Sequence, residues 1–248
     1  MTVDALGYRM KFGVIAPSTN TIVQPDFDDM RPRGVTNHYA RIFIPNTPLN
    51  SDADFELLME NIRKELLAAV DRVVTCEPDY LIMGMSSETF WGGLEGSSRF
   101  RERVEGHSKL KISMGSDASQ EALRRLGARR LGVITPYMPV GDKNVRRFFE
   151  ESGFELVKLI GLKCDSPVHI AHVTQERLRD AIMEVNSREV DAIVQVGTNL
   201  SMMRLAAIAE QFLNKPVIAI NTATYWHALR HNGIDDKLDG FGRLLSEL

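Results

Sequence analysis

The sequence predicts an α/β fold with two similar lobes, each built around a parallel sheet, and a cleft between them. Apolar runs of strand length alternate along the chain with segments whose apolar residues recur at helical spacing. Short connections between such elements are typical of parallel sheets that helices cover on both faces. The chain also repeats itself: MKFGVIAPSTN (10–20) resembles RRLGVITPYMP (129–139), and YLIMGMSSETF (80–90) resembles AIVQVGTNLSM (192–202).

The first half is expected to contain three strands and one long helix. The helix, at residues 53–76, has apolar side chains at helical spacing, and Ser51 or Asp52 can cap its start. The third strand is a continuous apolar run and is therefore expected to be buried on both faces. The three strands are expected at residues 11–18, 37–45 and 79–85.

The second half is expected to contain four strands and five helices. Thr174 can cap one helix, Ser116 or Asp117 can cap another, and Gly127 and Gly233 can end two of them. The strands are expected at residues 129–137, 154–162, 190–198 and 215–222. The helices are expected at residues 116–128, 140–154, 174–189, 200–214 and 223–233.

A chain of 248 residues is long enough to bury the cores of two small lobes. We expect residues 1–115 together with 222–248 to form the first lobe, and residues 116–221 to form the second. A net charge of -3 with scattered basic residues argues against a nucleic-acid surface. No apolar run approaches the ~20 residues of a membrane span, and the N-terminus lacks a signal-peptide core. We therefore expect a cytoplasmic protein with no membrane partner.

The two cysteines, Cys76 and Cys164, are too few for a disulfide framework and lack the spacing of a metal site. We expect no metal and no cofactor. Cys76 precedes the third expected strand, away from that strand's carboxyl end, and is expected to be a small core residue.

Four loops are expected to meet in the cleft, because ligands of open parallel sheets bind at the carboxyl ends of the strands. Serine and threonine after a strand are also ordinary helix caps and turn residues. Here four strand ends, two in each half of the chain, carry similar residues, which favours a shared site. The loops, at residues 17–20, 84–89, 135–138 and 196–199, offer Ser18, Asn20, Ser86, Ser87, Thr89, Tyr137, Thr198 and Asn199.

Nearly all of these groups are uncharged hydrogen-bond donors. Backbone N–H groups where helices begin add to them, because the helix dipole favours a negative charge there. Such donors suit one or two carboxylates, and they suit negative charge that appears during a reaction, as in an enolate or enediolate. The sequence therefore predicts a site for a small carboxylate.

The same motifs resemble the aspartate/glutamate racemase superfamily, and within it the branch of maleate cis-trans isomerases and arylmalonate decarboxylases. The resemblance covers nearly the whole chain and is carried by GVIAPSTNT, ETFWGG, GVITPYM, and VGTNL followed by KPVIAINTATYWHALR. It implies two Rossmann-like or flavodoxin-like lobes related by a pseudo-twofold axis, with the active-site cleft between them. It also implies chemistry without a cofactor and a homodimer or higher homo-oligomer.

In this family, two reactive positions face each other across the substrate, one in each lobe. Racemases and maleate isomerases have cysteine at both positions, and arylmalonate decarboxylases have glycine at the first and cysteine at the second. The resemblance places the first position at Gly84, or at Met85 with a shift of one residue, and the second at Val196. Since none of these is cysteine, a reaction that uses a thiol is not expected here.

The resemblance also assigns binding roles. Asn20 and Tyr137 correspond to residues that hold a substrate carboxylate. Ser86 corresponds to a hydroxyl of the pocket that stabilises the enediolate, and Met85 replaces the threonine expected beside it. Ser166 is the nearest match to a pocket residue of the second lobe. Two further residues, Gly197 and Thr198, are expected to present backbone N–H groups to the substrate.

Without thiols, the proton must be carried by another group. Glu88, four residues after Gly84, and His169 are the candidates. Alternatively, Glu88 has a structural role only, in which its negative charge interacts favourably with the dipole of a helix that starts there. His169 belongs to an H-x-x-H sequence, which is a poor metal signal without further ligands.

These observations predict an isomerase or a lyase of the decarboxylase kind, which acts on a small carboxylate or dicarboxylate without a cofactor and moves a proton without cysteine. One alternative is a carboxylate-binding protein that kept the binding loops and lost the chemistry. Another is an amidase or hydrolase that uses Ser86 or Ser87, although no G-x-S-x-G elbow surrounds them.

Overall fold

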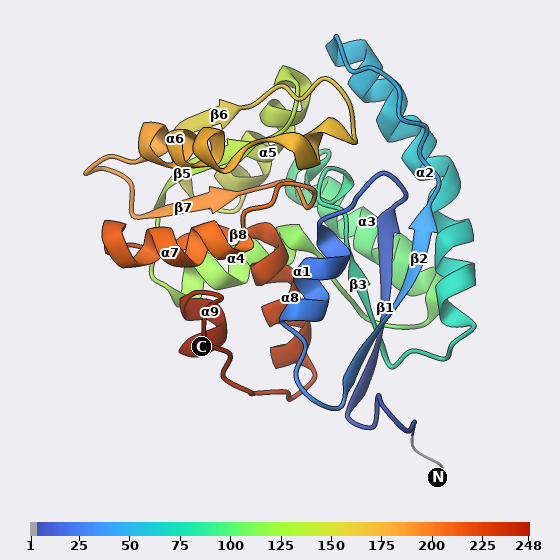
Figure 1. Ribbon diagram of the computed structural model, residues 1–248. Coiled ribbons are helices and arrows are strands. Elements are labelled where there is room, and N and C mark those ends of the chain that lie inside the picture. The colour runs from blue at the N-terminus through green and yellow to red at the C-terminus, as the bar shows by residue number, and fades with distance from the viewer. Residues whose placement is uncertain (1–3) are drawn as a thin grey trace.

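Two four-stranded parallel sheets organise the chain, which the computed structural model describes from residue 4 to residue 248 (Figure 1). The first sheet has the strand order β2-β1-β3-β4, and the second has the order β6-β5-β7-β8. Each half contributes its strands in the same order, so the two-lobed α/β fold predicted from the internal repeat is confirmed. The strands are β1 (Met10–Pro17), β2 (Val35–Ile42), β3 (Tyr80–Met83), β4 (Ile112–Ser113), β5 (Arg130–Thr135), β6 (Glu155–Gly161), β7 (Ala192–Gln195) and β8 (Val217–Ala219).

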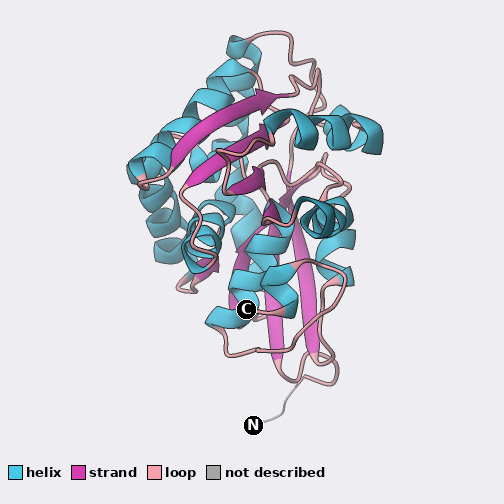
Figure 2. Cartoon of the chain, turned by 90° about the vertical axis from the view of Figure 1, so that its left-hand side faces the viewer, coloured by secondary structure: helices cyan, strands magenta, loops and turns pink. Residues whose placement is uncertain are grey.

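Helices surround the strands of both sheets (Figure 2). No helix among residues 4–248 combines the length and the apolar character that a membrane crossing requires. The α-helices are α1 (Val23–Asp29), α2 (Asp52–Val74), α3 (Gly93–Ser108), α4 (Gly115–Arg125), α5 (Pro139–Glu151), α6 (Gln175–Val185), α7 (Met203–Leu213), α8 (Ile220–His231) and α9 (Arg243–Ser246), and two short 3₁₀ helices are η1 (Glu88–Phe90) and η2 (His169–His172).

Two predicted helix caps are present, and one is not. The hydroxyl of Ser51 accepts a hydrogen bond from the backbone N–H of Asp54 at the start of α2, and Thr174 does the same for Arg177 at the start of α6. The predicted Ser/Asp cap of α4 is wrong. That helix begins one residue earlier than expected, and the residue before it is Met114, whose side chain makes no capping bond.

The strand predicted at residues 215–222 is wrong in its second half. It ends at Ala219, and α8 begins at the next residue. Ten consecutive residues of α8, from Ile220 to Leu229, are buried, so the helix has no polar face that would reveal a period of 3.6. This helix packs against β3 and β4 of the first sheet and against α4.

The sequence patterns did not predict α1, α3, β4, α9 or the two 3₁₀ helices. The longest of these, α3, reads GLEGSSRFRERVEGHS and buries only Gly93, Ser97, Phe100 and Val104. Two small residues on a buried helical face give no hydrophobic signal. Their small size lets α3 pack closely on its neighbours, and the hydroxyl of Ser97 lies 2.8 Å from that of Ser116 on α4.

The core is continuous between the two lobes. One cluster of buried apolar side chains runs from β1 and β3 of the first sheet to β5 and β7 of the second. Phe90 of η1 meets Phe148 of α5 edge to face, with ring centroids 5.0 Å apart, and lies 5.6 Å from the ring of Phe149. The lobes therefore share part of one apolar core.

Candidate active site

A cavity of about 60 Å³ lies where the loops after β1, β3, β5 and β7 meet. By the same measure, a single water needs roughly 10–15 Å³, so the cavity has room for a small organic molecule. Of the ten residues predicted to bind substrate, the structure brings eight together here: Asn20, Met85, Ser86, Ser87, Tyr137, Gly197, Thr198 and Asn199.

The cavity has one polar side and one apolar side. The apolar side comes largely from α2 and the chain that leads into it, and from η2 of the second lobe. The side chains that form it are Ile44, Leu49, Phe55, Leu58, Ile62 and Ile170, with Pro17, Pro136 and Pro167 at the loops. No Lys, Arg, His, Asp or Glu side chain lines the cavity among the residues that the structure describes.

A chain of hydrogen bonds connects the two lobes beneath the cavity. The side-chain amide of Asn20 donates to the hydroxyl of Thr198 over 2.9 Å, and that hydroxyl donates to the carbonyl of Gly84 over 3.0 Å. The side-chain oxygen of Asn20 accepts from the backbone N–H groups of Ile22 and Val23. These bonds leave Asn20 one free N–H for a ligand.

Asn199 makes a second connection between the lobes. Its side-chain oxygen accepts from the backbone N–H of Thr21, and its amide donates to the carbonyl of Pro167 over 3.0 Å. Asn221, on α8, supports the same loop, because it donates to the carbonyl of Thr198 and to Asp26. The β7–α7 loop is thus fixed before any ligand arrives.

Tyr137 and Ser86 form the hydroxyl pair of the site. Their oxygens lie 2.9 Å apart, and both residues are buried. Burial raises the pKa of the Tyr137 phenol above its ordinary value, so the phenol is neutral near pH 7. Each hydroxyl brings one proton, and only one proton is needed for the bond between them, so the pair keeps a donor for a ligand.

Six backbone N–H groups complete the set of donors. They belong to two loops, one after β3 and one after β7, and none of them donates to an acceptor within residues 4–248. Buried N–H groups are almost always paired in folded proteins. All six residues line the cavity, so their unpartnered N–H groups are available to a carboxylate or an enediolate. They are the N–H groups of Met85, Ser86, Ser87, Gly197, Thr198 and Asn199.

The structure does not bring the two proton-transfer candidates into the cavity. Glu88 lies in η1, where one carboxylate oxygen pairs with Arg63 at 2.6 Å and the other has no partner among the described residues. Burial raises the pKa of Glu88, although Arg63 opposes the shift. His169 is exposed and pairs with Asp165 at 2.7 Å. Its helix, η2, turns only Ile170 toward the cavity.

Four other predicted site residues lie beside the cavity, not at its wall. Ser18 exchanges hydrogen bonds with the backbone of Ile44, and Ser166 accepts one from the backbone of His169. Gly84 and Val196 continue the two sheets, since their N–H groups donate to the neighbouring strands. The side chain of Val196 is fully buried and apolar, so it offers no group for proton transfer.

A sequence profile described as arylmalonate decarboxylase matches residues 63–245 of this chain. The chain belongs to the arylmalonate decarboxylase family.

Curated relatives of this family member are maleate isomerases. That of Nocardia farcinica is 24% identical over 257 residues, which cover 98% of this chain and 97% of the relative. That of Pseudomonas putida is 23% identical and covers 95% of this chain and 97% of the relative. The match to the Alcaligenes faecalis enzyme is 25% identical over 140 residues and spans only 55% of that protein.

Solved structures show the same fold. The Nocardia farcinica maleate cis-trans isomerase with a covalently bound succinylcysteine intermediate superposes with a TM-score of 0.87 at 22% identity, covering 96% of this chain and 99% of the other. A double mutant of arylmalonate decarboxylase in a liganded form superposes with a TM-score of 0.79 at 18% identity, covering 96% of this chain and 100% of the other. The family resemblance predicted from the motifs is confirmed.

Neither cysteine of this family member lines the cavity. The prediction that Cys76 is a core residue is wrong: it is exposed in the turn after α2, where its thiol donates to the carbonyl of Val73. Cys164 is half-buried in a shallow hollow with His169 and His172. Burial raises the pKa of its thiol to about 11, which keeps the unreactive protonated form near pH 7.

The apolar wall was not predicted as part of the site. Phe55, Leu58 and Ile62 follow one another at helical spacing, and the sequence gives them the same signal as core residues of α2. Thr19 was also missed, between two residues that were singled out. Only the position of α2 across the strand ends distinguishes a cavity wall from a core.

Proposed function

We propose that this protein is a cofactor-independent lyase of the decarboxylase kind, which acts on a small dicarboxylate with an apolar substituent. The observation that carries this proposal is the cavity itself, with uncharged donors from both lobes on one side and apolar side chains on the other. The donors suit carboxylates, and the apolar wall of Phe55, Leu58 and Ile62 suits a hydrocarbon or aryl group.

In the proposed reaction, the substrate is a substituted malonate. One carboxylate lies against the unpartnered N–H groups of the two loops. The bond from the α-carbon to the second carboxylate breaks, carbon dioxide leaves, and the electron pair remains in an enediolate. Tyr137, Ser86 and the N–H groups donate to its oxygens, which stabilises the negative charge as it forms. Protonation of the α-carbon then gives a monocarboxylic acid.

Tyr137 is our candidate for the proton donor. It is the single titratable side chain among the described residues that line the cavity. Its raised pKa suits the protonation of a strongly basic carbon, and water can return the proton to the phenol afterwards. Glu88 and His169, which lie outside the cavity, have no part in this proposal.

A lyase is favoured over a maleate isomerase by the absence of a thiol. In the Nocardia farcinica isomerase structure, the intermediate is bonded to a cysteine. Neither cysteine of the present chain lines the cavity. A covalent intermediate of that kind has no nucleophile here, whereas an enediolate needs only hydrogen-bond donors.

The test is a thermal-shift screen of substituted malonates, maleate, hydroxy acids and amino acids, followed by NMR of each stabilising compound in D₂O. We expect a malonate with an apolar substituent to lose carbon dioxide and to take up one deuterium on its α-carbon. The matched control is the cysteine-free double variant Cys76→Ser, Cys164→Ser, which should keep full activity. Loss of activity in that variant would contradict the thiol-free mechanism.

A carboxylate-binding protein without catalysis is the second candidate. It is favoured by the hydrogen bonds of Asn20, Thr198 and Asn199, most of which serve the structure of the loops. In that case a ligand at a hundredfold its Kd raises the free energy of unfolding by about 2.7 kcal/mol, and no tight-binding carboxylate exchanges deuterium or is converted.

A further inference from the structure

Three potential metal ligands converge outside the cavity, between α4 and the helix α8 that packs on the first sheet. His227 and His231 lie four residues apart on α8 and therefore on one face of the helix. Their rings stack with centroids 3.7 Å apart. Glu121 of α4 faces both, with one carboxylate oxygen 2.9 Å from the Nε2 atom of His231 and 3.4 Å from that of His227. One ligand atom from each residue lies within 4.8 Å of the others.

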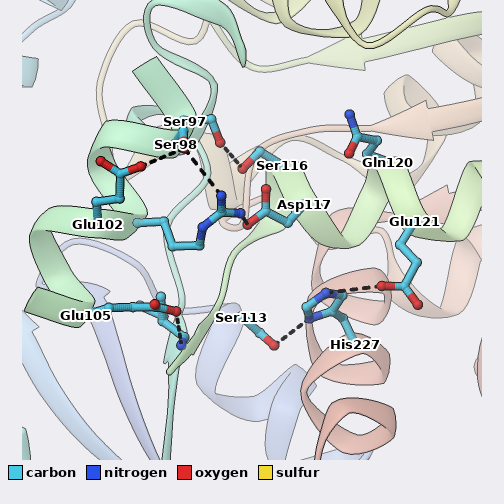
Figure 3. Close-up of polar contacts among 12 residues, drawn as sticks. Ser97, Ser98, Glu102, Glu105, Ser113, Ser116, Asp117, Gln120, Glu121 and His227 are labelled. Carbon is cyan, nitrogen blue, oxygen red and sulfur yellow. Dashed lines mark hydrogen bonds and ion pairs between the residues drawn. The ribbon is translucent and has the colours of Figure 1, made fainter. Parts of the chain in front are cut away.

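The contacts of His227 determine which of its nitrogens is free. Figure 3 shows the imidazole of His227 between Ser113 and Glu121. The Ser113 hydroxyl lies 2.6 Å from Nδ1 of His227, and it donates its own proton to the Tyr80 hydroxyl over 3.3 Å. With Nδ1 of His227 against Ser113, Nε2 is the ring nitrogen that faces Glu121. A histidine that binds a metal typically donates its other N–H in this way.

The three side chains meet between α4 and α8. The same carboxylate oxygen of Glu121 faces the Nε2 atoms of both histidines. His227 is buried, and His231 and Glu121 are partly exposed. The three ligand atoms therefore lie close enough together to hold one ion.

We propose that Glu121, His227 and His231 bind one divalent transition-metal ion of the zinc type. Two imidazoles and a carboxylate are a common ligand set for Zn²⁺, and a fourth position remains for water. The other oxygen of Glu121 is held by Arg125 at 2.7 Å, so the carboxylate offers a single oxygen to the metal. Because His231 and Glu121 are partly exposed, both side chains can close to the roughly 2 Å ligand distances that Zn²⁺ requires.

The proposed ion connects α8, the buried helix near the end of the chain, to α4. None of its three ligands lines the cavity, so this proposal does not depend on the proposed function. The ion has a structural role here: it fixes the position of α8, whose Asn221 supports the β7–α7 loop of the cavity.

The test is calorimetric titration of the full chain with Zn²⁺ near pH 7.5, and a parallel titration with Co²⁺ followed by visible absorption. We expect one ion per chain and, for Co²⁺, the intense bands of a four-coordinate complex. His231→Gln and Glu121→Gln should each weaken binding by at least about tenfold. These two residues are partly exposed, so the variants are expected to fold even if a change at the buried His227 does not.

Two controls separate this site from general binding of metals to surface histidines. His107→Gln removes a histidine that pairs with Asp71 at 2.6 Å but has no second histidine beside it. His172→Gln changes the hollow that contains Cys164 and His169. Both variants should bind Zn²⁺ as the unaltered protein does. The proposal is overturned if no Zn²⁺ binds, if His231→Gln binds it unchanged, or if His172→Gln is the variant that loses it.

Discussion

At the scale of single residues, the hydroxyl pair of Tyr137 and Ser86 is the most informative feature of the cavity. Each hydroxyl comes from a different lobe, both residues are buried, and both line the cavity. Both residues were predicted from the motifs as substrate-binding residues. Their mutual hydrogen bond was not predictable, because nothing in the sequence fixes the distance between two loops that lie 51 residues apart.

Tyr137→Phe tests the role proposed for the phenol. The substitution removes one hydrogen-bond donor and the proposed proton source, and it leaves the Ser86 hydroxyl buried without its partner. We expect kcat for the decarboxylated substrate to fall by roughly 10²–10⁴-fold, and the free energy of unfolding to fall by about 1–3 kcal/mol.

The control for this variant is Tyr225→Phe. Tyr225 is also buried, and its hydroxyl also makes one hydrogen bond, to Asn37, but it lies away from the cavity. It should show a similar change in stability and an unaltered kcat. Equal losses of kcat in the two variants would show that the effect of Tyr137→Phe is structural.

At the scale of elements, the end of β3 is built for close packing. An atom added as a Cβ at Gly84 would lie 3.0 Å from the Cβ of Ala16 and 3.3 Å from the carbonyl oxygen of Ile15. The carbonyl of Gly84 also accepts the hydroxyl of Thr198 from the other lobe. A side chain here would push β3 away from β1 and disturb the bond between the lobes.

We therefore expect Gly84→Ala to lower the free energy of unfolding by about 1–3 kcal/mol, since the packed strand cannot accept extra volume without moving. Gly106→Ala on α3 is the matched control, because no atom lies within 4 Å of its added methyl group. It should be neutral or stabilising by up to about 1 kcal/mol. Urea denaturation of both variants measures the difference, and equal effects would exclude crowding at Gly84.

The elements differ in how clearly the sequence signals them. Strands β1, β3, β5 and β7 and their loops were predicted well, because apolar runs that end in glycine or proline turns carry a local signal. By contrast, α3 buries small residues, and α8 is buried all round. Neither has an amphipathic pattern, and their boundaries depend on neighbours that are distant in sequence. The cavity wall on α2 was missed for a related reason, because its role depends on which distant elements lie opposite the helix.

At the scale of the whole molecule, the shared core predicts that the two lobes unfold together. The rings of Phe90, Phe148 and Phe149 lie within 5.0–5.6 Å of each other across the boundary between η1 and α5. The hydrogen bonds of Asn20, Thr198 and Asn199 also join the lobes, at the cavity.

We expect Phe148→Ala to destabilise both lobes together, by about 3–5 kcal/mol, because it empties a fully buried aromatic site. The tryptophan fluorescence of Trp91 and Trp226 and the far-UV circular dichroism should then show a single, coincident urea transition at a lower midpoint. Two separated transitions would mean that the lobes unfold independently.

In the proposed reaction, the polar loops carry the chemistry and the apolar face of α2 sets which substrates fit. Phe55, Leu58 and Ile62 project from one continuous helix, whereas every uncharged donor of the cavity comes from loops outside it. A combinatorial library of substitutions at these three positions would thus change which carboxylic acids bind. The hydrogen-bond donors of the loops would stay unchanged. Such modularity makes this scaffold a practical starting point for evolving new substrate ranges.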